Sequence, residues 1–194
     1  MQIHSPEELN FLRILRTNPC ITTILDRAPQ LGLSDWYLTA GAVFQTVWNH
    51  LDGRDPQSGI NDYDLFYFDD SDIGYEAEDD VIRRADALFD DLDVRVEVRN
   101  EARVHLWYEH HFGVPATPFT DCNDAIDHFA STCCYGIRRN PTGDDEIYAP
   151  HGFTDLFDMV LRPNPVLAPR DVYEAKAARW QKEWPRLTVV PWPE

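Results

Sequence analysis

The stretch Asn61-Asp62-Tyr63-Asp64-Leu65-Phe66-Tyr67-Phe68-Asp69 predicts a β-strand that carries two carboxylates at its start. Side chains alternate between the two faces of a strand, so Asp62 and Asp64 share one face, and Tyr63, Leu65 and Tyr67 share the other. Like charges on one face repel, and aspartate is depleted in strands, so the pair suggests a divalent cation between the carboxylates. A solvated strand end is the alternative, because acidic residues are abundant in this chain.

A glycine turn lies upstream of that strand. Residues 36–40, WYLTA, predict a short buried strand that ends at Gly41, and from Ala42 onward the apolar side chains recur with helical spacing. A strand that turns directly into a helix presents free backbone N–H groups and the positive end of the helix dipole, which suits a phosphate. Such a turn, followed by the strand of Asp62 and Asp64, is the arrangement that metal-assisted phosphoryl or nucleotidyl transfer requires.

The composition indicates a folded protein and restricts its partners. With 194 residues, of which 43% are hydrophobic and 12% aromatic, the chain suits a single domain over residues 1–194. Its 17 basic and 34 acidic residues give a net charge of -17, which repels extended nucleic acid and anionic membrane surfaces. The N-terminus lacks the pattern of a secretory signal, and no apolar run is long enough to span a membrane, so we expect a cytoplasmic protein.

Helical and strand-like patterns follow one another along the chain without a repeat or a linker. Charged residues alternate with valine at 93–98, which predicts a third strand, and residues 135–138 and 146–149 predict a hairpin. A capping box at Ser5 predicts the start of the first helix. Further helices, including the C-terminal ones, are expected at 19–31, 79–89, 105–112, 121–130, 155–161 and 171–184.

These motifs resemble a known superfamily. Residues 39–42 (TAGA), 44–49 (FQTVWN) and 62–65 (DYDL) are similar to the glycine turn, helix and D-h-D-h strand of the DNA polymerase β-like nucleotidyltransferase superfamily. Within it, the segments GAVFQTVWN, INDYDLFYFD, NEARVHLWYEHHFG, IYAPHGFTDLF and KAARWQKEWP resemble a bacterial nucleotidyltransferase-like family. The resemblance implies an α+β fold in which a small mixed β-sheet is flanked by helices. It also implies three carboxylates that bind two divalent cations, Mg²⁺ or Mn²⁺.

The resemblance assigns catalytic and metal-binding roles to individual acids. Asp62 and Asp64 match the first two carboxylates of the superfamily. The third comes from a neighbouring strand, where Glu97 is our choice and Asp93 is the rival. An ion pair between Glu97 and a neighbouring arginine is the alternative, because alternating charges on an exposed strand face need no metal.

Nucleotide phosphates are expected near the glycine turn and the end of the third strand. Gly41 and Ala42 match the phosphate-binding turn, and Arg99 and Arg103 are expected to reach the triphosphate. A structural role at the edge of the sheet is the alternative for Arg103. In the superfamily a serine commonly follows the glycine, whereas Ala42 has no hydroxyl. The binding of phosphate is therefore expected to rest on the backbone.

Taken together, the residues and the resemblance predict a metal-dependent nucleotidyltransferase. Such an enzyme transfers a nucleoside monophosphate from a nucleoside triphosphate to an acceptor, here an unidentified small molecule or protein. A catalytically inactive nucleotide-binding module, or an antitoxin-like partner protein on the same fold, is a second possibility that Ala42 favours. A metal-dependent phosphohydrolase that uses the same acids is a third. The net charge of -17 argues against an extended nucleic acid as acceptor.

Overall fold

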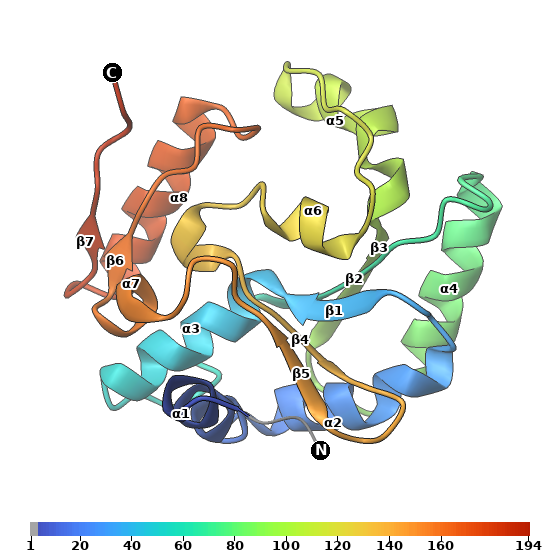
Figure 1. Ribbon diagram of the computed structural model, residues 1–194, viewed down its shortest axis with the longest axis horizontal. Coiled ribbons are helices and arrows are strands. Elements are labelled where there is room, and N and C mark those ends of the chain that lie inside the picture. The colour runs from blue at the N-terminus through green and yellow to red at the C-terminus, as the bar shows by residue number, and fades with distance from the viewer. Residues whose placement is uncertain (1–3) are drawn as a thin grey trace.

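A five-stranded mixed β-sheet forms the centre of the computed structural model, which describes residues 4–194 (Figure 1). The strands lie in the order β3-β2-β1-β4-β5; β2 and β3 are parallel and the other neighbours are antiparallel. The strands span Trp36–Thr39 (β1), Asp62–Tyr67 (β2), Arg95–Asn100 (β3), Gly136–Arg139 (β4) and Asp145–Tyr148 (β5). The α+β architecture predicted from the sequence is therefore confirmed, with β4 and β5 forming the expected hairpin.

Helices at the N-terminal end of the chain pack under one face of the sheet (Figure 1). They are α1 (Pro6–Leu15), α2 (Pro19–Arg27), the 3₁₀ helix η1 (Ala28–Leu31) and α3 (Ala40–Leu51). Ser5 forms the predicted capping box with Glu8 at the start of α1. Helix α3 begins at Ala40, two residues earlier than the sequence suggested, so the glycine of the turn lies inside its first turn.

The remaining helices are α4 (Tyr75–Leu88), η2 (Glu101–Arg103), α5 (Val104–Phe112), α6 (Cys122–Ile126), η3 (Ser131–Cys133), α7 (Thr154–Phe157) and α8 (Arg170–Glu183). The helix expected at 155–161 is instead the short α7 followed by strand β6 (Val160–Leu161). This strand pairs in parallel with β7 (Thr188–Val189), which the sequence analysis missed because two residues are too few to show alternation. No helix in the described part of the chain is long and apolar enough to cross a membrane.

The two faces of the sheet differ in chemistry. On one face Leu38, Leu65 and Val98 lie side by side in register, and each is at most 3% exposed. This face supports the main hydrophobic core, which α1, α2 and α3 complete. On the other face Asp64 pairs with Thr39 of β1 on one side and with Glu97 of β3 on the other. The predicted alternation along β2 therefore separates core from carboxylates.

Buried amide side chains hold the loop that leads into β2 in place through hydrogen bonds. Asn49, which has no exposed surface, donates from Nδ2 to the carbonyl oxygens of Pro56 and Ser58 at 3.2 and 2.7 Å. Its Oδ1 accepts from Nε1 of Trp184, next to the end of α8, at 3.0 Å. Asn18 donates to Tyr63 Oη of β2 at 3.1 Å. The long connection between α3 and β2 is therefore held in place, and with it the start of β2.

Candidate active site

A cavity of about 470 Å³ lies over the carboxylate-bearing face of the sheet. Its floor is formed by β2, β3 and the first turn of α3, and its walls come from α5, α6 and α8. Helices α5 and α8 lie on opposite sides of α6 in Figure 1. Asp62, Asp64 and Glu97 all line this cavity together with Gly41. Residues from three separate parts of the chain, α3, β2 and β3, thus meet at one place.

The structure brings Glu97 to the two aspartates. Glu97 is the register partner of Asp64 on the adjacent parallel strand, so both side chains point to the same face. Asp93 precedes β3 and is not among the described residues that line the cavity. The ion pairs considered as the alternative are also present, because Arg99 lies 2.6 Å from Oε1 of Glu97 and Arg95 lies 3.0 Å from Oε2.

Asp64 is a buried carboxyl in the floor of the cavity. Burial raises the pKa of its carboxyl to about 7, and the negative charges of Asp62 and Glu97 add to the rise. The charges of Lys176 and Arg99 oppose it. A neighbouring cation stabilises the ionised form of such a carboxyl, because a positive charge offsets both the desolvation and the repulsion between the acids.

The donor atoms suit a hard divalent cation that shares its ligands with a substrate. Within residues 4–194, no three His, Cys, Asp or Glu side chains are grouped closely enough to hold a metal ion by themselves. Glu97 has both of its carboxylate oxygens bound by arginines. Asp62 and Asp64 remain, and Mg²⁺ is usually bound by one or two carboxylates plus substrate phosphates and water. The residues present therefore fit such a cation.

The turn between β1 and α3 has a constrained backbone. Ala40 has a φ of 55°, a left-handed conformation that is uncommon outside glycine and is often found at functional sites. A Cβ on Gly41 would lie 2.8 Å from Nε2 of Gln45, so glycine leaves room for this amide. Gln45 is 7% exposed and lines the cavity, and its Oε1 has no hydrogen-bond partner among residues 4–194. No local pattern in the chain singles out Gln45.

Two of the four residues expected to bind nucleotide line the cavity. Gly41 and Arg99 do so, with Arg99 bound to Glu97. The side chain of Ala42 is completely buried, and Ala42 is not among the described residues that line the cavity. Arg103 is also not among the described residues that line the cavity, because its guanidinium binds Glu78 of α4 and the carbonyl oxygen of Ile73. For Arg103 the structural alternative is the one observed.

Glu101, a fourth acid at the cavity, was not anticipated. It follows Glu97 and Arg99 at alternate positions and is 4% exposed at the start of η2. Burial raises the pKa of its carboxyl well above the usual range, and the charge of Asp64 raises it further, while Arg99 opposes the rise. Burial of this kind favours the protonated form of the carboxyl, which can donate a hydrogen bond. The alternation of β3, extended by two residues, is the signal that could have found it.

The walls of the cavity are largely aromatic. Trp107 and Tyr108 of α5 face it from one side, and Tyr173 and Trp180 of α8 face it from the other. Trp107 is 40% exposed, whereas Trp180 is 8% exposed. Aromatic walls above a charged floor are typical of sites that bind a ligand with a planar, apolar part and an anionic part.

A mixed sheet that presents paired aspartates beside a strand-to-helix glycine turn defines the nucleotidyltransferase class of fold. The comparison with protein families agrees, since the family described as Nucleotidyltransferase matches residues 26–189, and the chain belongs to this family. A solved NMR structure described as a CCA-adding enzyme head domain is similar at a TM-score of 0.76 and 25% identity. That likeness covers 94% of this chain and 95% of the other. No curated protein matches the chain.

Proposed function

We propose that the protein is a metal-dependent nucleotidyltransferase that transfers a nucleoside monophosphate from a nucleoside triphosphate to a hydroxyl group of a small-molecule or protein acceptor. The observation that carries the proposal is the placement of Asp62 and Asp64 on one face of β2, beside Gly41, in the floor of a cavity. Membership of the nucleotidyltransferase family supports the reaction class.

Asp62 and Asp64 would hold Mg²⁺ or Mn²⁺, with Glu97 as the third carboxylate of the site once its oxygens leave the arginines. A bound cation would neutralise the charge of the triphosphate and of the departing pyrophosphate. In the transfer, the acceptor oxygen bonds to the α-phosphorus as the bond from this phosphorus to the bridging oxygen breaks. Pyrophosphate leaves, and the acceptor proton passes to a carboxylate oxygen of the floor.

The other residues of the cavity bind and orient the nucleotide. The N-terminus of α3 at Gly41 offers backbone N–H groups and a positive dipole end to a phosphate. The buried amide of Gln45 has an acceptor oxygen without a partner in residues 4–194, which suits a hydroxyl or amino group of the nucleotide. Trp107 and Tyr108 provide aromatic surface for a base and restrict the access of water.

One observation favours a second function, a nucleotide-binding module without catalysis. Arg95 and Arg99 together occupy both oxygens of Glu97, and Ala42 lacks the hydroxyl that the superfamily commonly uses. If Glu97 never leaves its arginines, the site binds nucleotide through Asp62 and Asp64 but activates no acceptor. Both functions predict that the protein binds nucleotide, but only the transferase predicts turnover.

The experiment that tests the proposal measures pyrophosphate release from each of the four ribonucleoside triphosphates with Mg²⁺ or Mn²⁺ and an acceptor-containing lysate fraction. We expect release with wild-type protein and its loss in the Asp64→Asn variant, which keeps the shape of the side chain but removes its charge. Asp70→Asn is the matched control, since Asp70 is exposed on the same segment and lies outside the described lining of the cavity.

Three outcomes would contradict the proposal. Unchanged release by Asp64→Asn would remove this carboxylate from the mechanism. Release of orthophosphate in place of pyrophosphate would indicate a phosphohydrolase. Binding of nucleotide without turnover under any of these conditions would favour the inactive module.

A further inference from the structure

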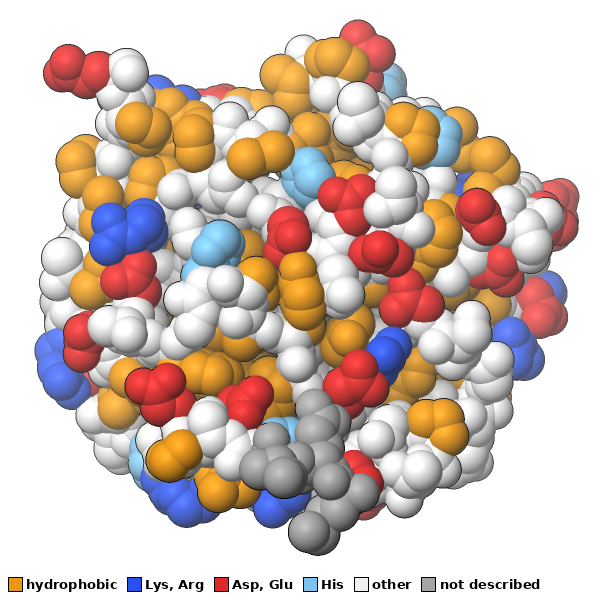
Figure 2. All heavy atoms as spheres, viewed as in Figure 1, with side chains coloured by type: hydrophobic (Ala, Val, Ile, Leu, Met, Phe, Trp, Pro, Cys, Tyr) orange, Lys and Arg blue, Asp and Glu red, His pale blue; other side chains and the backbone are white. Residues whose placement is uncertain are grey.

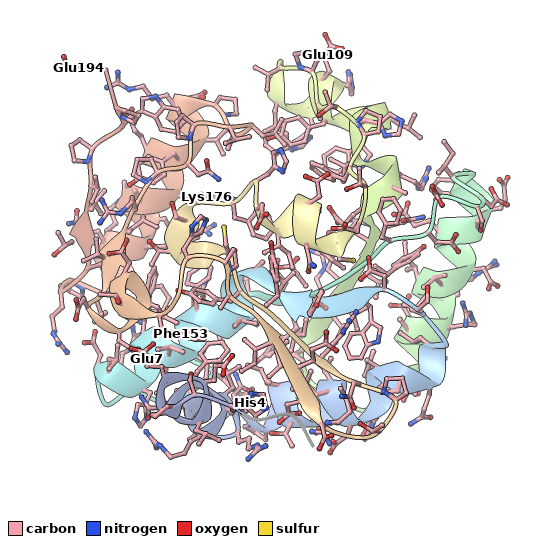
Figure 3. All side chains as sticks on the ribbon, viewed as in Figure 1. His4, Glu7, Glu109, Phe153, Lys176 and Glu194 are labelled. Atoms are coloured by element: carbon pink, nitrogen blue, oxygen red, sulfur yellow. The ribbon has the colours of Figure 1, made fainter. Side chains whose placement is uncertain are left out.

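Helix α8 presents two basic side chains to the carboxylate-lined cavity. Val172, Lys176 and Arg179 are spaced at i, i+4 and i+7, so they share one face of the helix, and all three line the cavity. The neighbouring stripe of α8 is buried against the protein core. The chain has only two lysines, and one of them is placed here. In Figure 3, Lys176 lies on the inward side of α8.

These two cations differ from the other basic groups near the cavity. Arg95 and Arg99 are both bound to Glu97, and Arg103 is bound to Glu78. In contrast, neither Lys176 nor Arg179 has an ion pair or a hydrogen bond from its side chain within residues 4–194, although the chain holds twice as many acids as bases. The guanidinium of Arg179 lies over the ring of its own neighbour, Trp180. Unpaired cations that face a cavity are available for an anionic ligand.

The position of α8 is fixed by packing, so these cations face the floor from a rigid element. The ring of Trp180 packs edge-on against that of Phe44 in α3, with ring centroids 5.1 Å apart. The hydroxyl of Tyr173 donates to the carbonyl oxygen of Val190 at 2.6 Å. Lys176 and Asp64 line the same cavity, so a positive charge of the α8 wall meets the acidic floor there.

The glycine turn alone offers little to a triphosphate. Ala42 has no hydroxyl, its side chain is buried, and the arginines of β3 are engaged with a carboxylate. We propose that Lys176 and Arg179 of α8 bind the β- and γ-phosphates of the nucleoside triphosphate and orient its pyrophosphate group for departure. This inference rests on the proposed function only in taking a nucleoside triphosphate as the ligand. It assigns the site's specificity for the triphosphate over the monophosphate to α8.

The test measures binding and needs no acceptor. Trp107, Trp180 and Trp192 line the cavity, so quenching of tryptophan fluorescence reports ligand entry, and calorimetry provides an independent value. The ligands are ATP, AMP and inorganic pyrophosphate, each with Mg²⁺. The variants are Lys176→Gln and Arg179→Gln, and Lys176→Arg tests rescue by a second cation. Lys182→Gln is the matched control, because it removes the same charge from an exposed position on α8 that is not part of the described lining.

We expect Lys176→Gln and Arg179→Gln each to weaken ATP and pyrophosphate binding about tenfold, the loss typical of one charge-assisted contact. AMP binding should change less than about twofold, since AMP lacks the two outer phosphates. Lys176→Arg should retain most of the ATP affinity, and Lys182→Gln should bind all three ligands as wild type does. Equal thermal unfolding temperatures would show that the variants are folded.

Two results would overturn the assignment, and they can be told apart. If wild type prefers ATP to AMP and both glutamine variants keep that preference, the outer phosphates are bound elsewhere. That result would leave the proposed function, nucleotidyl transfer, uncontradicted. If wild type binds neither ATP nor pyrophosphate with Mg²⁺, both this assignment and the proposed function fail.

Discussion

At the scale of single residues, the site is held in a conformation that costs stability. Asp64 sits beside Asp62 and Glu97, and both burial and repulsion raise the pKa of its carboxyl to about 7. In the unfolded chain the same carboxyl titrates near its ordinary value of about 4. Between these two values the folded state holds a proton that the unfolded state has released. The stability of the metal-free protein should therefore fall as the pH rises from about 4 to about 7 and then level off.

The Asp64→Asn variant should remove this pH dependence. We expect it to be more stable than wild type by about 1–3 kcal/mol at pH 8, with the difference vanishing near pH 4. Urea unfolding curves measured between pH 4 and pH 8 without divalent cations provide the check. Adding Mg²⁺ at pH 8 should stabilise wild type and leave Asp64→Asn unchanged. Parallel stability curves for the two proteins over this range would contradict the prediction.

A second prediction concerns Gly41 and the amide of Gln45. A methyl group at Gly41 meets Nε2 of Gln45 at 2.8 Å, so Gly41→Ala should push this side chain into the cavity. Because the clash is with the end of a side chain and not with backbone, the loss of stability should stay below about 1 kcal/mol. Nucleotide affinity should fall clearly. In the double variant Gly41→Ala, Gln45→Ala the space is restored, so its affinity should equal that of Gln45→Ala alone. A clearly lower affinity would show that Gly41 acts by another route.

At the scale of secondary-structure elements, the loop between α3 and β2 is stabilised by side chains that are not among the described residues lining the cavity. Asn49→Ala would remove the donors to Pro56 and Ser58 and leave the indole N–H of Trp184 unpaired in the core. We expect a loss of about 2–4 kcal/mol in the free energy of unfolding, measured by chemical denaturation. Asn10→Ala on the exposed face of α1 is the control and should cost less than about 0.5 kcal/mol. Equal losses for the two would contradict the role of Asn49.

The sequence predicted those elements whose pattern is local. The alternation in β2, the capping box at Ser5 and the glycine turn each depend on neighbours in the chain. The first two were placed correctly, and the turn was placed to within two residues of the start of α3. The approach of α8 to the cavity depends on contacts between Trp180 and Phe44, which no local pattern reveals. For the same reason Lys176, Gln45 and the partner of Arg103 were not foreseen.

At the scale of the whole molecule, charge restricts the acceptor. Figure 2 shows acidic side chains spread over one face of the protein, with fewer basic ones. With a net charge of -17, the protein should not bind tRNA or single-stranded DNA at physiological ionic strength, which we expect gel-shift and anisotropy titrations to show. Micromolar, salt-sensitive binding that is lost on mutating Arg95 and Arg99 would contradict this. This test bears directly on the choice of acceptor, because the similar solved structure is described as a CCA-adding enzyme head domain.

The hydrogen bond between Trp184 and Asn49 has a consequence for biosynthesis. It joins residues that are 135 positions apart, so the loop that precedes β2 cannot be fastened until the end of α8 has emerged from the ribosome. Domains generally fold as units, and contacts this distant in sequence form late. In a nascent chain paused before residue 184, the loop that precedes Asp62 and Asp64 would lack its hydrogen bond to Trp184. The protein should therefore acquire the ability to hold a nucleotide only after Trp184 has left the ribosome and paired with Asn49.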